Sequence, residues 1–567
     1  MKGGGGGGGG GTRRRRISLN LLHGFLLISA VLSGFGLIIL TIRSISIDPN
    51  NSFKLPTTIT TTATTDDDYD SVSTFDSNTT YFKSDSCATV EEMGEVFAPN
   101  EFAVKESLRV RRMIQQHFLL NGAPRVRDLS PEQFCHHGFV LGKSAEAGFG
   151  NEMYKILSAA ALSIMLNRSL IIGQTRGKYP FGEYISYTNL SFTLKEVKHL
   201  WRQNDCVGKY GRSLIMRIDD FEKPGESNVL CSNWRKWNQP VIWFQGTTDA
   251  VGIQLFLKNI HSEMRSAASE LFGQAGALFS RPNVFGELMR VIVSPSEDVE
   301  HAVNWVLSGS VDPDIALHMR MLTNRSVRAL QAALSCLKKA LLICQQQVAR
   351  PRVVLVSDSP SLIKDITPSV QEFAEVVHFN YKLFNGNISS LTSNGAHQLD
   401  FRVKDWGPAP RWVAFADFFL ASRAKHGVVS GAHRRVGTTY AQLIAALAAA
   451  NQLDESTSPM NFTFLSSFQK NLLSDGLANQ VGWGHVWNRF AGPLSCHGQS
   501  RQCAHTPLLP LAWWDGTWQS PIPRDIRRME AFGVRLSSLG EINESSLRSY
   551  CENRKSFVRT TPIARQT

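Results

Sequence analysis

The sequence has no pair of cysteines in the Cys-x-x-Cys spacing and no spacing typical of a zinc finger. This absence argues against a zinc site and against thioredoxin-like redox chemistry, because both use closely spaced thiolates. The chain also lacks an aromatic–basic ribonucleoprotein motif, so its net charge of +12 does not indicate a nucleic-acid partner. Four of those charges, Arg13–Arg16, instead precede a long apolar run.

Nine cysteines are nevertheless present: Cys87, Cys135, Cys206, Cys231, Cys336, Cys344, Cys496, Cys503 and Cys551. In an oxidising compartment, Cys206 with Cys231 and Cys496 with Cys503 are candidate disulfides that would close local loops. Because the count is odd, at least one cysteine is left free or bound to another chain. The sequence alone does not fix the pairing.

Acidic and basic residues are absent from Ile17 to Ile42, apart from the titratable His23. This run exceeds the roughly 20 residues that a helix needs to cross a bilayer, and no clear cleavage site follows it. It therefore predicts a transmembrane signal anchor at residues 17–42. The basic residues before it place a tail of residues 1–16 in the cytosol and the rest of the chain in the lumen. A cleaved signal peptide is the alternative.

Residues 43–95 are rich in Thr, Ser and Asp and poor in apolar residues. Such a composition cannot form a core and predicts a disordered stem. The acidic run Asp66–Asp70 could attract calcium, but it lacks the pattern of an EF-hand loop, and a solvated charge run is the simpler interpretation. Asn-x-Ser/Thr triplets agree with a lumenal location; they begin at Asn50, Asn78, Asn167, Asn189, Asn324, Asn387, Asn461 and Asn543.

Beyond the stem, strand-like apolar runs alternate with helix-like runs, which is typical of α/β folds with parallel sheets. A first unit leads from a strand at Gly138–Leu141 through a glycine-rich turn and a helix to a strand at Ser169–Ile172. On this helix, apolar residues recur at three- and four-residue spacing, which predicts a buried stripe. They are Met153, Leu157, Ala160, Ala161, Ile164 and Met165.

A second alternation begins near Asp312 with a strand at Ile315–Met319 and ends with a helix at Thr438–Ala450. We therefore predict a Rossmann-like domain at residues 96–300, another at residues 301–455, and a C-terminal extension at residues 456–567. Tryptophans of the extension either line a sugar-binding surface or, more simply, pack against the second domain. They are Trp483, Trp487, Trp513, Trp514 and Trp518.

Polar side chains stand at three predicted strand ends of the second domain, in His318–Arg320, Ser357–Asp358 and Ser430–Arg435. Parallel sheets bind ligands at the carboxyl ends of their strands, so the three clusters would share one crevice if their strands are neighbours. Arginine side chains and helix N-termini both favour phosphate groups. The pattern therefore predicts an anion site. A solvated loop that caps an ordinary helix is the alternative for Ser430–Arg435.

Four segments resemble motifs of GDP-fucose-dependent fucosyltransferases of the α1,6, plant cell-wall and protein O-fucosyl types. "GFGNEMYKILSAAALSIMLNRSLII" resembles their glycine loop, and "HMR" resembles their H-x-R phosphate motif. "VVLVSDSPSLI" resembles their strand that ends in Ser/Thr-Asp-x-Pro, and "FADFFLASRAKHGVVSGAHRRVGTTYAQLI" resembles their third motif. The whole chain also resembles plant type II membrane proteins.

The resemblance implies a GT-B fold, in which two Rossmann-like domains face each other and the second holds the GDP-fucose donor. It implies that Arg320 contacts the pyrophosphate beside His318 and that Asp358 lies at the nucleotide or at its supporting loop. The other residues that it implies for the donor site are Gly148, Gly150, Asn151, Ser430, His433, Arg434 and Arg435. For Gly148 and Gly150, a tight turn without a ligand is the alternative.

The chain departs from the family pattern at two places. Ala432, His433 and Arg434 stand where the families often keep hydroxyl or amide donors to phosphate, and Arg435 follows. After H-x-R the families continue with a second basic residue and an acid, whereas this chain has Met321–Thr323. The second departure bears on which sugar nucleotide the protein would use as donor and on whether the protein is catalytically active.

Glycosyl transfer requires a stabilised diphosphate leaving group and a base for the acceptor hydroxyl. Metal-independent enzymes of this fold stabilise the diphosphate with arginine and helix N-termini, so we expect no metal and no cofactor beyond the GDP-fucose substrate. The base is usually a carboxylate. Our candidates are Glu152 and Asp249, with Asp219 and Asp220 as alternatives.

Together these observations predict a single-pass type II glycosyltransferase of the Golgi membrane with a lumenal C-terminal region. It would transfer fucose to a glycan or glycoprotein acceptor. The alternative is a catalytically inactive, membrane-anchored protein of the same fold that binds glycans or sugar nucleotides. A third class, a calcium-binding or scaffold protein, depends on the acidic stem alone.

Overall fold

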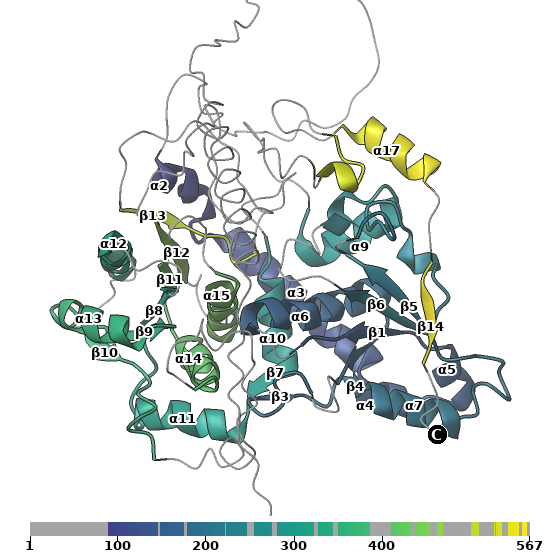
Figure 1. Cartoon of the computed structure of the whole chain (residues 1–567), viewed down its shortest axis with the longest axis horizontal. Coiled ribbons are helices and arrows are strands. Elements are labelled where there is room, and N and C mark those ends of the chain that lie inside the picture. The colour runs from purple at the N-terminus through teal and green to yellow at the C-terminus, as the bar shows by residue number, and fades with distance from the viewer. Residues whose placement is uncertain are drawn as a thin grey trace, which may run out of the picture. The chain divides into compact units, whose positions relative to one another are not determined.

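Two six-stranded sheets dominate the computed structural model of the chain (Figure 1). The structure describes residues 89–145, 148–174, 179–221, 223–245, 255–274, 281–321, 327–343, 350–385, 410–431, 438–453, 462–468, 501–509, 527, 529–535, 543–554 and 558–563. The predicted tail and anchor, and the stem up to residue 88, lie outside these ranges. None of the described helices combines the length and apolar character that a bilayer crossing requires.

The first sheet has the strand order β14-β5-β6-β1-β2-β4. Its strands are β1 (Phe139–Gly142), β2 (Ser169–Ile172), β4 (Phe192–Thr193), β5 (Ile215–Asp220), β6 (Val241–Gln245) and β14 (Thr560–Pro562). All neighbours are parallel except β14, which pairs antiparallel with β5. A strand from the end of the chain therefore completes this sheet.

Helices cover both faces of the first sheet because alternate residues of its strands are buried on opposite sides. The outer helices are α4 (Ala123–Arg127), α5 (Pro131–His136) and α7 (Leu194–Gln203), and the inner face packs on α6 (Phe149–Leu166). Every residue of the stripe predicted for α6 is buried. The helix ends at Asn167, whose φ of 51° places it in the left-handed conformation that often ends a helix.

The second sheet has the order β10-β9-β8-β11-β12-β13 and is parallel up to its last strand, which is antiparallel. Its strands are β8 (Ile315–Met319), β9 (Arg352–Ser357), β10 (Glu375–Val377), β11 (Gly427–Gly431), β12 (Thr463–Phe468) and β13 (Gln502–His505). Helices α12 (Val327–Ile343) and α13 (Pro360–Gln371) cover the outer face. Helices α14 (Val413–Ala421) and α15 (Thr439–Gln452) cover the inner face. The fold is therefore α/β with mainly parallel sheets, as the sequence predicted.

One continuous hydrophobic core joins the inner faces of both sheets. Helix α15 packs against α6 and against α10 (Val284–Ile292) (Figure 1). The contact with α10 is close, since a Cβ on Gly286 would lie 2.0 Å from the carbonyl oxygen of Ala446. Asn283, which caps α10, donates from Nδ2 to that same carbonyl at 2.6 Å. Helix α15 is therefore attached to elements on both sides of the core.

A buried arginine reinforces this attachment at the C-terminal end of α15. Arg111, on α3 (Glu101–Asn121), forms two hydrogen bonds of 2.8 and 2.9 Å with the fully buried carboxylate of Glu287. It also donates to the carbonyls of Ala450 and Leu453, each at 2.6 Å. A cation at a helix C-terminus is stabilising because the unpaired carbonyls there carry partial negative charge.

The remaining elements are short helices, one small sheet and a C-terminal helix. The helices are α2 (Val90–Gly94), η1 (Glu95–Phe97), η2 (Trp234–Lys236), η3 (Leu255–Lys258), α9 (Ser262–Phe272), α11 (Glu297–Leu307) and α17 (Glu544–Asn553). Strands β3 (Ile185–Tyr187) and β7 (Val293–Pro295) form an antiparallel pair.

All six cysteines in the described part of the chain form disulfides: Cys135–Cys206, Cys231–Cys551 and Cys336–Cys503. The pairing predicted from short loops, Cys206 with Cys231 and Cys496 with Cys503, is therefore wrong. Each observed bridge joins segments at least 71 residues apart. Tertiary packing brings these segments together, and sequence spacing does not report it. Cys496 itself lies outside the described residues.

Candidate functional site

Three predicted polar strand ends are neighbours in the second sheet. Strand β8 lies between β9 and β11, with His318 opposite Ser430 on one side and Val356 on the other. One residue further on, Met319 lies opposite Ser357. Because the strands are parallel, their carboxyl ends meet at one edge of the sheet. The three strands are therefore neighbours, and the shared crevice at their ends stays a prediction.

The end of β9 supports the segment that carries Arg320. The hydroxyl of Ser357 donates to the carbonyl of Met319 at 2.8 Å, and Asp358 Oδ1 accepts from the backbone N–H of Met321 at 2.6 Å. The N-cap position of helix α13 is Ser359, one residue beyond Asp358. These bonds hold the backbone on either side of Arg320, whose side chain is exposed.

His318 is a neutral imidazole at the base of this edge. Only 6% of its surface is exposed. Burial, with a smaller contribution from the positive charge of Arg320, lowers its pKa from 6.5 to about 3. Its ring lies 5.1 Å from the ring of Tyr440, and Nδ1 has no hydrogen-bond partner among the described residues. His318 can therefore offer a hydrogen bond here, but it does not supply a positive charge near neutral pH.

Ser430 lies beside His318 on the same face of the sheet, since residues paired across parallel strands point the same way. It is fully buried, and its hydroxyl has no hydrogen-bond partner within the described part of the chain. Buried polar groups without partners are rare and costly. The inner face therefore holds two adjacent neutral polar groups, directly beneath the strand ends.

The glycine loop of the first sheet meets the N-terminus of α15. Thr439 donates from its hydroxyl to Asn151 Oδ1 at 2.7 Å. A Cβ on Gly150 would lie 2.7 Å from both the Thr439 hydroxyl and the backbone nitrogen of Tyr440. Glycine is therefore required here for the close approach of two helices. Since Gly148 caps α6 and α6 follows β1, this junction brings the carboxyl edges of the two sheets together.

The candidate bases occupy different surroundings. Glu152 accepts hydrogen bonds from the backbone N–H of Ala145 at 2.7 Å and from Lys155 Nζ at 3.0 Å. Asp220, at the end of β5, accepts from Gln245 at the end of β6 at 3.2 Å. Both carboxylates thus lie at the carboxyl edge of the first sheet.

The carboxylate of Asp219 is part of a buried ion pair. Its Oδ2 accepts from Arg217 Nε at 2.9 Å, and the guanidinium of Arg217 stacks over Trp237 at 3.3 Å from the ring centroid. Burial raises the pKa of Asp219, while the charge of Arg217 opposes that rise. This arrangement is that of a structural ion pair, because both side chains are buried.

Several predicted residues lie outside the described part of the chain: Asp249, Ala432, His433, Arg434, Arg435 and the five tryptophans of the extension. Among the described residues, no group of three His, Cys, Asp or Glu side chains is placed to hold a metal ion.

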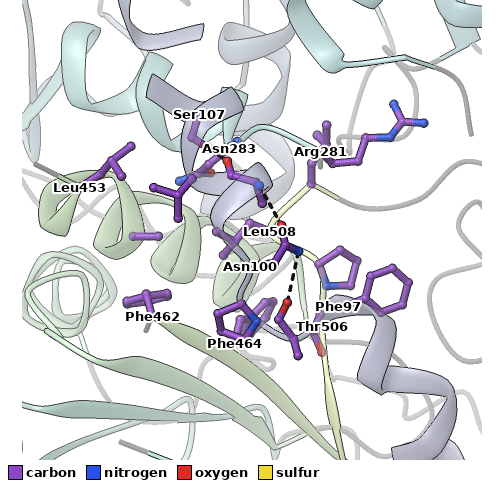
Figure 2. A pocket seen from close by; sticks show the side chains of 17 residues that line it. Phe97, Asn100, Ser107, Arg281, Asn283, Leu453, Phe462, Phe464, Thr506 and Leu508 are labelled. Atoms are coloured by element: carbon purple, nitrogen blue, oxygen red, sulfur yellow. Dashed lines mark hydrogen bonds between the residues drawn. The ribbon is translucent and has the colours of Figure 1, made fainter. Parts of the chain in front are cut away.

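A separate cavity lies at the opposite end of α15 (Figure 2). Its wall includes Phe97 and Asn100 before α3, Leu453 after α15, Phe464 on β12 and Leu508 beyond β13. Its volume of about 110 Å³ is small beside the roughly 300 Å³ or more of typical ligand pockets. Sequence reasoning missed this cavity because its lining comes from four distant segments with no common motif.

A family model matches residues 82–563, well over half of the chain. The chain belongs to DUF7810. This is a family of unknown function. No curated protein matches this DUF7810 member.

Among solved structures, this DUF7810 chain is similar to fucosyltransferase NodZ from Bradyrhizobium, with 12% identity over 55% of this chain and 92% of that one, at a TM-score of 0.32. It is similar to a mutant of Arabidopsis thaliana FUT1 in complex with GDP, with 11% identity over 69% of this chain and 85% of that one, at a TM-score of 0.37. It is also similar to POFUT1 in complex with GDP, with 11% identity over 59% of this chain and 98% of that one, at a TM-score of 0.31. Similarities this low carry no weight for the activity of this chain.

Proposed function

We propose that this protein is a fucosyltransferase that transfers fucose from GDP-fucose to a glycan or glycoprotein acceptor. In this proposal the two sheets are the two halves of a GT-B enzyme. The observation that carries it is the order β9-β8-β11, which puts Asp358, Arg320 and Ser430 at one edge of the second sheet. These are the positions of the fucosyltransferase motifs in the sequence.

The donor diphosphate would bind where this edge meets α6. The first turns of α6 and α15 touch through Asn151 and Thr439, so the positive ends of two long helices lie close together. Helix N-termini attract phosphate through their free N–H groups and dipoles. Arg320 adds an exposed, permanently charged guanidinium that can bind phosphate with two hydrogen bonds. The leaving diphosphate would thus be stabilised without a metal.

Proton removal from the acceptor hydroxyl is assigned to Glu152 or Asp249. Glu152 lies in the first turn of α6, two residues from Gly150. The ammonium of Lys155 and the N–H of Ala145 fix the position of its carboxylate. A base that is held in place can act at a defined point of the acceptor. Glu152→Gln is expected to abolish transfer while GDP binding persists, as measured by calorimetry.

The proposed location is the Golgi lumen, with residues 17–42 as the membrane anchor. The support is the pairing of all six described cysteines in disulfides. Disulfides form and persist in oxidising compartments and are rare in the cytosol.

One observation favours the alternative of a protein that binds sugar nucleotides without turnover. Met321 stands where the fucosyltransferase motif continues with a second basic residue, and only 5% of its surface is exposed. Its side chain is part of the hydrophobic cluster on the outer face of the second sheet, which α12 and α13 cover. This position therefore supplies no second charge to the donor.

The test is calorimetric titration of the purified protein with GDP and GDP-fucose, followed by measurement of GDP release with glycan acceptors. Arg320→Ala should weaken GDP binding roughly 10- to 100-fold, since a hydrogen bond to a charged group contributes about 1.5–3 kcal/mol. The control is Arg350→Ala, which removes an exposed arginine just before β9, at the opposite end of that strand.

The outcomes separate the proposals. Binding followed by GDP release with an acceptor supports the transferase. Binding of both nucleotides without release supports the binding protein. Binding of neither rejects both. Unchanged affinity in Arg320→Ala would reject the site even if the protein binds GDP.

A further inference from the structure

The described residues contain three Asn-x-Ser triplets, and in each the asparagine is exposed. They begin at Asn167, Asn189 and Asn543. A sugar chain on the asparagine nitrogen is bulky and needs solvent around it. All three positions meet that requirement in the folded protein.

The first two triplets lie at one edge of the first sheet. Asn167 precedes β2 and Asn189 precedes β4, and these strands are parallel neighbours. Both asparagines are therefore at the amino edge of the sheet, away from the carboxyl edge that holds the candidate site. Helix α6 has 18 residues and thus spans about 27 Å. A glycan at its C-terminal residue Asn167 would leave the Gly150–Thr439 junction open.

The asparagine amides differ in their local roles. Asn167 is the left-handed C-cap of α6, and Asn189 lies in a turn; no hydrogen bond ties either side chain to another described residue. Asn543 caps α17 by accepting from the N–H of Ser546 at 2.9 Å. That bond uses the amide oxygen, so a glycan on Nδ2 would leave the cap intact.

The serines of the first two triplets are less accessible than their asparagines, whereas Ser545 of the third triplet is exposed. Ser169 is fully buried, and its hydroxyl donates to the carbonyl of Asn121 at 2.6 Å. Ser191 is half-buried. A modifying enzyme that reads the whole triplet can reach Asn167 only before β2 has docked. Modification must therefore accompany synthesis, in the compartment where the disulfides form.

We propose that Asn167, Asn189 and Asn543 each carry an N-linked glycan. The co-reactant is an oligosaccharide joined to a lipid diphosphate, supplied with its transferase by the host. The asparagine Nδ2 forms a bond to the anomeric carbon, and the bond from that carbon to the diphosphate oxygen breaks. One amide proton goes to the transferase, and the lipid diphosphate leaves. This proposal does not rest on the fucosyltransferase activity.

The test expresses the full chain in a eukaryotic host and analyses its peptides by mass spectrometry. A peptide N-glycosidase converts a glycosylated asparagine to aspartate, which marks each occupied site. We expect this mark at all three positions. In each variant that removes a triplet, the intact protein should lose the mass of one glycan.

The variants are chosen to preserve the fold. Asn167→Gly keeps a residue suited to the left-handed cap, and Asn543→Asp keeps an N-cap acceptor. Ser191→Ala removes the second triplet without touching Asn189, and its matched control, Ser191→Thr, should retain the glycan. Ser169 is left unchanged because its hydroxyl is bonded in the core.

A site whose peptide is recovered only unmodified loses its assignment. Unmodified Asn167 and Asn189 in a preparation whose three disulfides are formed would overturn the proposal. So would recovery of the chain with all six of these cysteines reduced, since it would then not have passed through an oxidising compartment. None of these results bears on GDP binding, so the two proposals fail independently.

Discussion

Single residues at the centre of this protein are held in the neutral state by burial. His318 is the clearest case: its pKa falls from 6.5 to about 3, mainly because it is desolvated. Between these values the unfolded chain binds a proton that the folded chain does not. The stability that His318 contributes is therefore fully present above pH 6.5 and is lost as the pH falls toward 3.

His318→Gln should consequently flatten the acid side of the stability curve. We expect the free energy of unfolding to fall less steeply with decreasing pH, by about 1.4 kcal/mol per pH unit across the window below the unfolded pKa. Denaturant unfolding of both proteins over a pH series measures this slope. Parallel curves would mean that the histidine is protonated equally in both states, contrary to its burial.

Arg111 illustrates how one side chain stabilises a helix end. Arg111→Ala would leave the buried carboxylate of Glu287 with the partly exposed Arg290 at 3.3 Å as its remaining cation, and would remove the Arg111 donors from the last carbonyls of α15. Breaking a buried pair by removing one partner costs about 3–5 kcal/mol. Arg109→Ala is the matched control on the same helix, because its pair with Glu106 is partly exposed and should cost about 0–1 kcal/mol. Chemical denaturation measures both losses, and equal losses would contradict the stabilising role of the Arg111 contacts.

At the scale of elements, the junction of α6 and α15 links the fold to the candidate site. In Gly150→Ala, the new methyl group would meet the Tyr440 nitrogen and the Thr439 hydroxyl at 2.7 Å. The two first turns must then separate, at a cost of about 1–3 kcal/mol, and GDP affinity should fall with them. Thermal unfolding and calorimetry on the same sample measure the two effects.

Gly225→Ala is the control for that substitution, because nothing lies within 4 Å of its added methyl group. Its stability should stay within about 0.5 kcal/mol of the parent, with unchanged affinity. If Gly150→Ala behaved like this control, the contact between the two helices would not exist in solution.

At the scale of the whole molecule, disulfides join segments that the sheets bring together. Cys231–Cys551 closes a separation of 320 residues and ties α17 to the segment between β5 and η2, whereas Cys135–Cys206 closes 71 residues. A longer closed loop restricts the unfolded chain more. Replacing both cysteines of each pair by serine should cost about 2–5 kcal/mol, with the long bridge costing roughly 1 kcal/mol more than the short one. Thermal unfolding provides the comparison, and the reverse order would contradict this account.

The elements that sequence predicted best are those with a strong local pattern. Strands β2 and β8 have the predicted bounds, and the stripe of α6 is buried throughout. Strand β5 was missed because Arg217, Asp219 and Asp220 interrupt its apolar pattern. Strand β14 was missed because it is three residues long and is stabilised by pairing with β5, more than 300 residues away.

For the candidate site too, the sequence predicted the features that depend on adjacent residues and missed those that depend on distant contacts. The polar residues at the strand ends were visible in the sequence, since a short apolar run that stops at a histidine, an aspartate or a serine is a local signal. That His318 is neutral, that Asp358 holds the Arg320 segment and that Gly150 meets α15 depends on neighbours far along the chain. No spacing rule contains those neighbours.

By itself the sequence determined the α/β class, the strands β2 and β8, and the order of the polar motifs, because hydrophobic periodicity and strand ends are properties of adjacent residues. Only the tertiary structure decided which strands are neighbours, which cysteines pair, and which polar groups are buried without partners. The physical reason is that pairing, burial and desolvation are set by contacts between distant segments, such as Arg111 with Glu287 and Asn151 with Thr439.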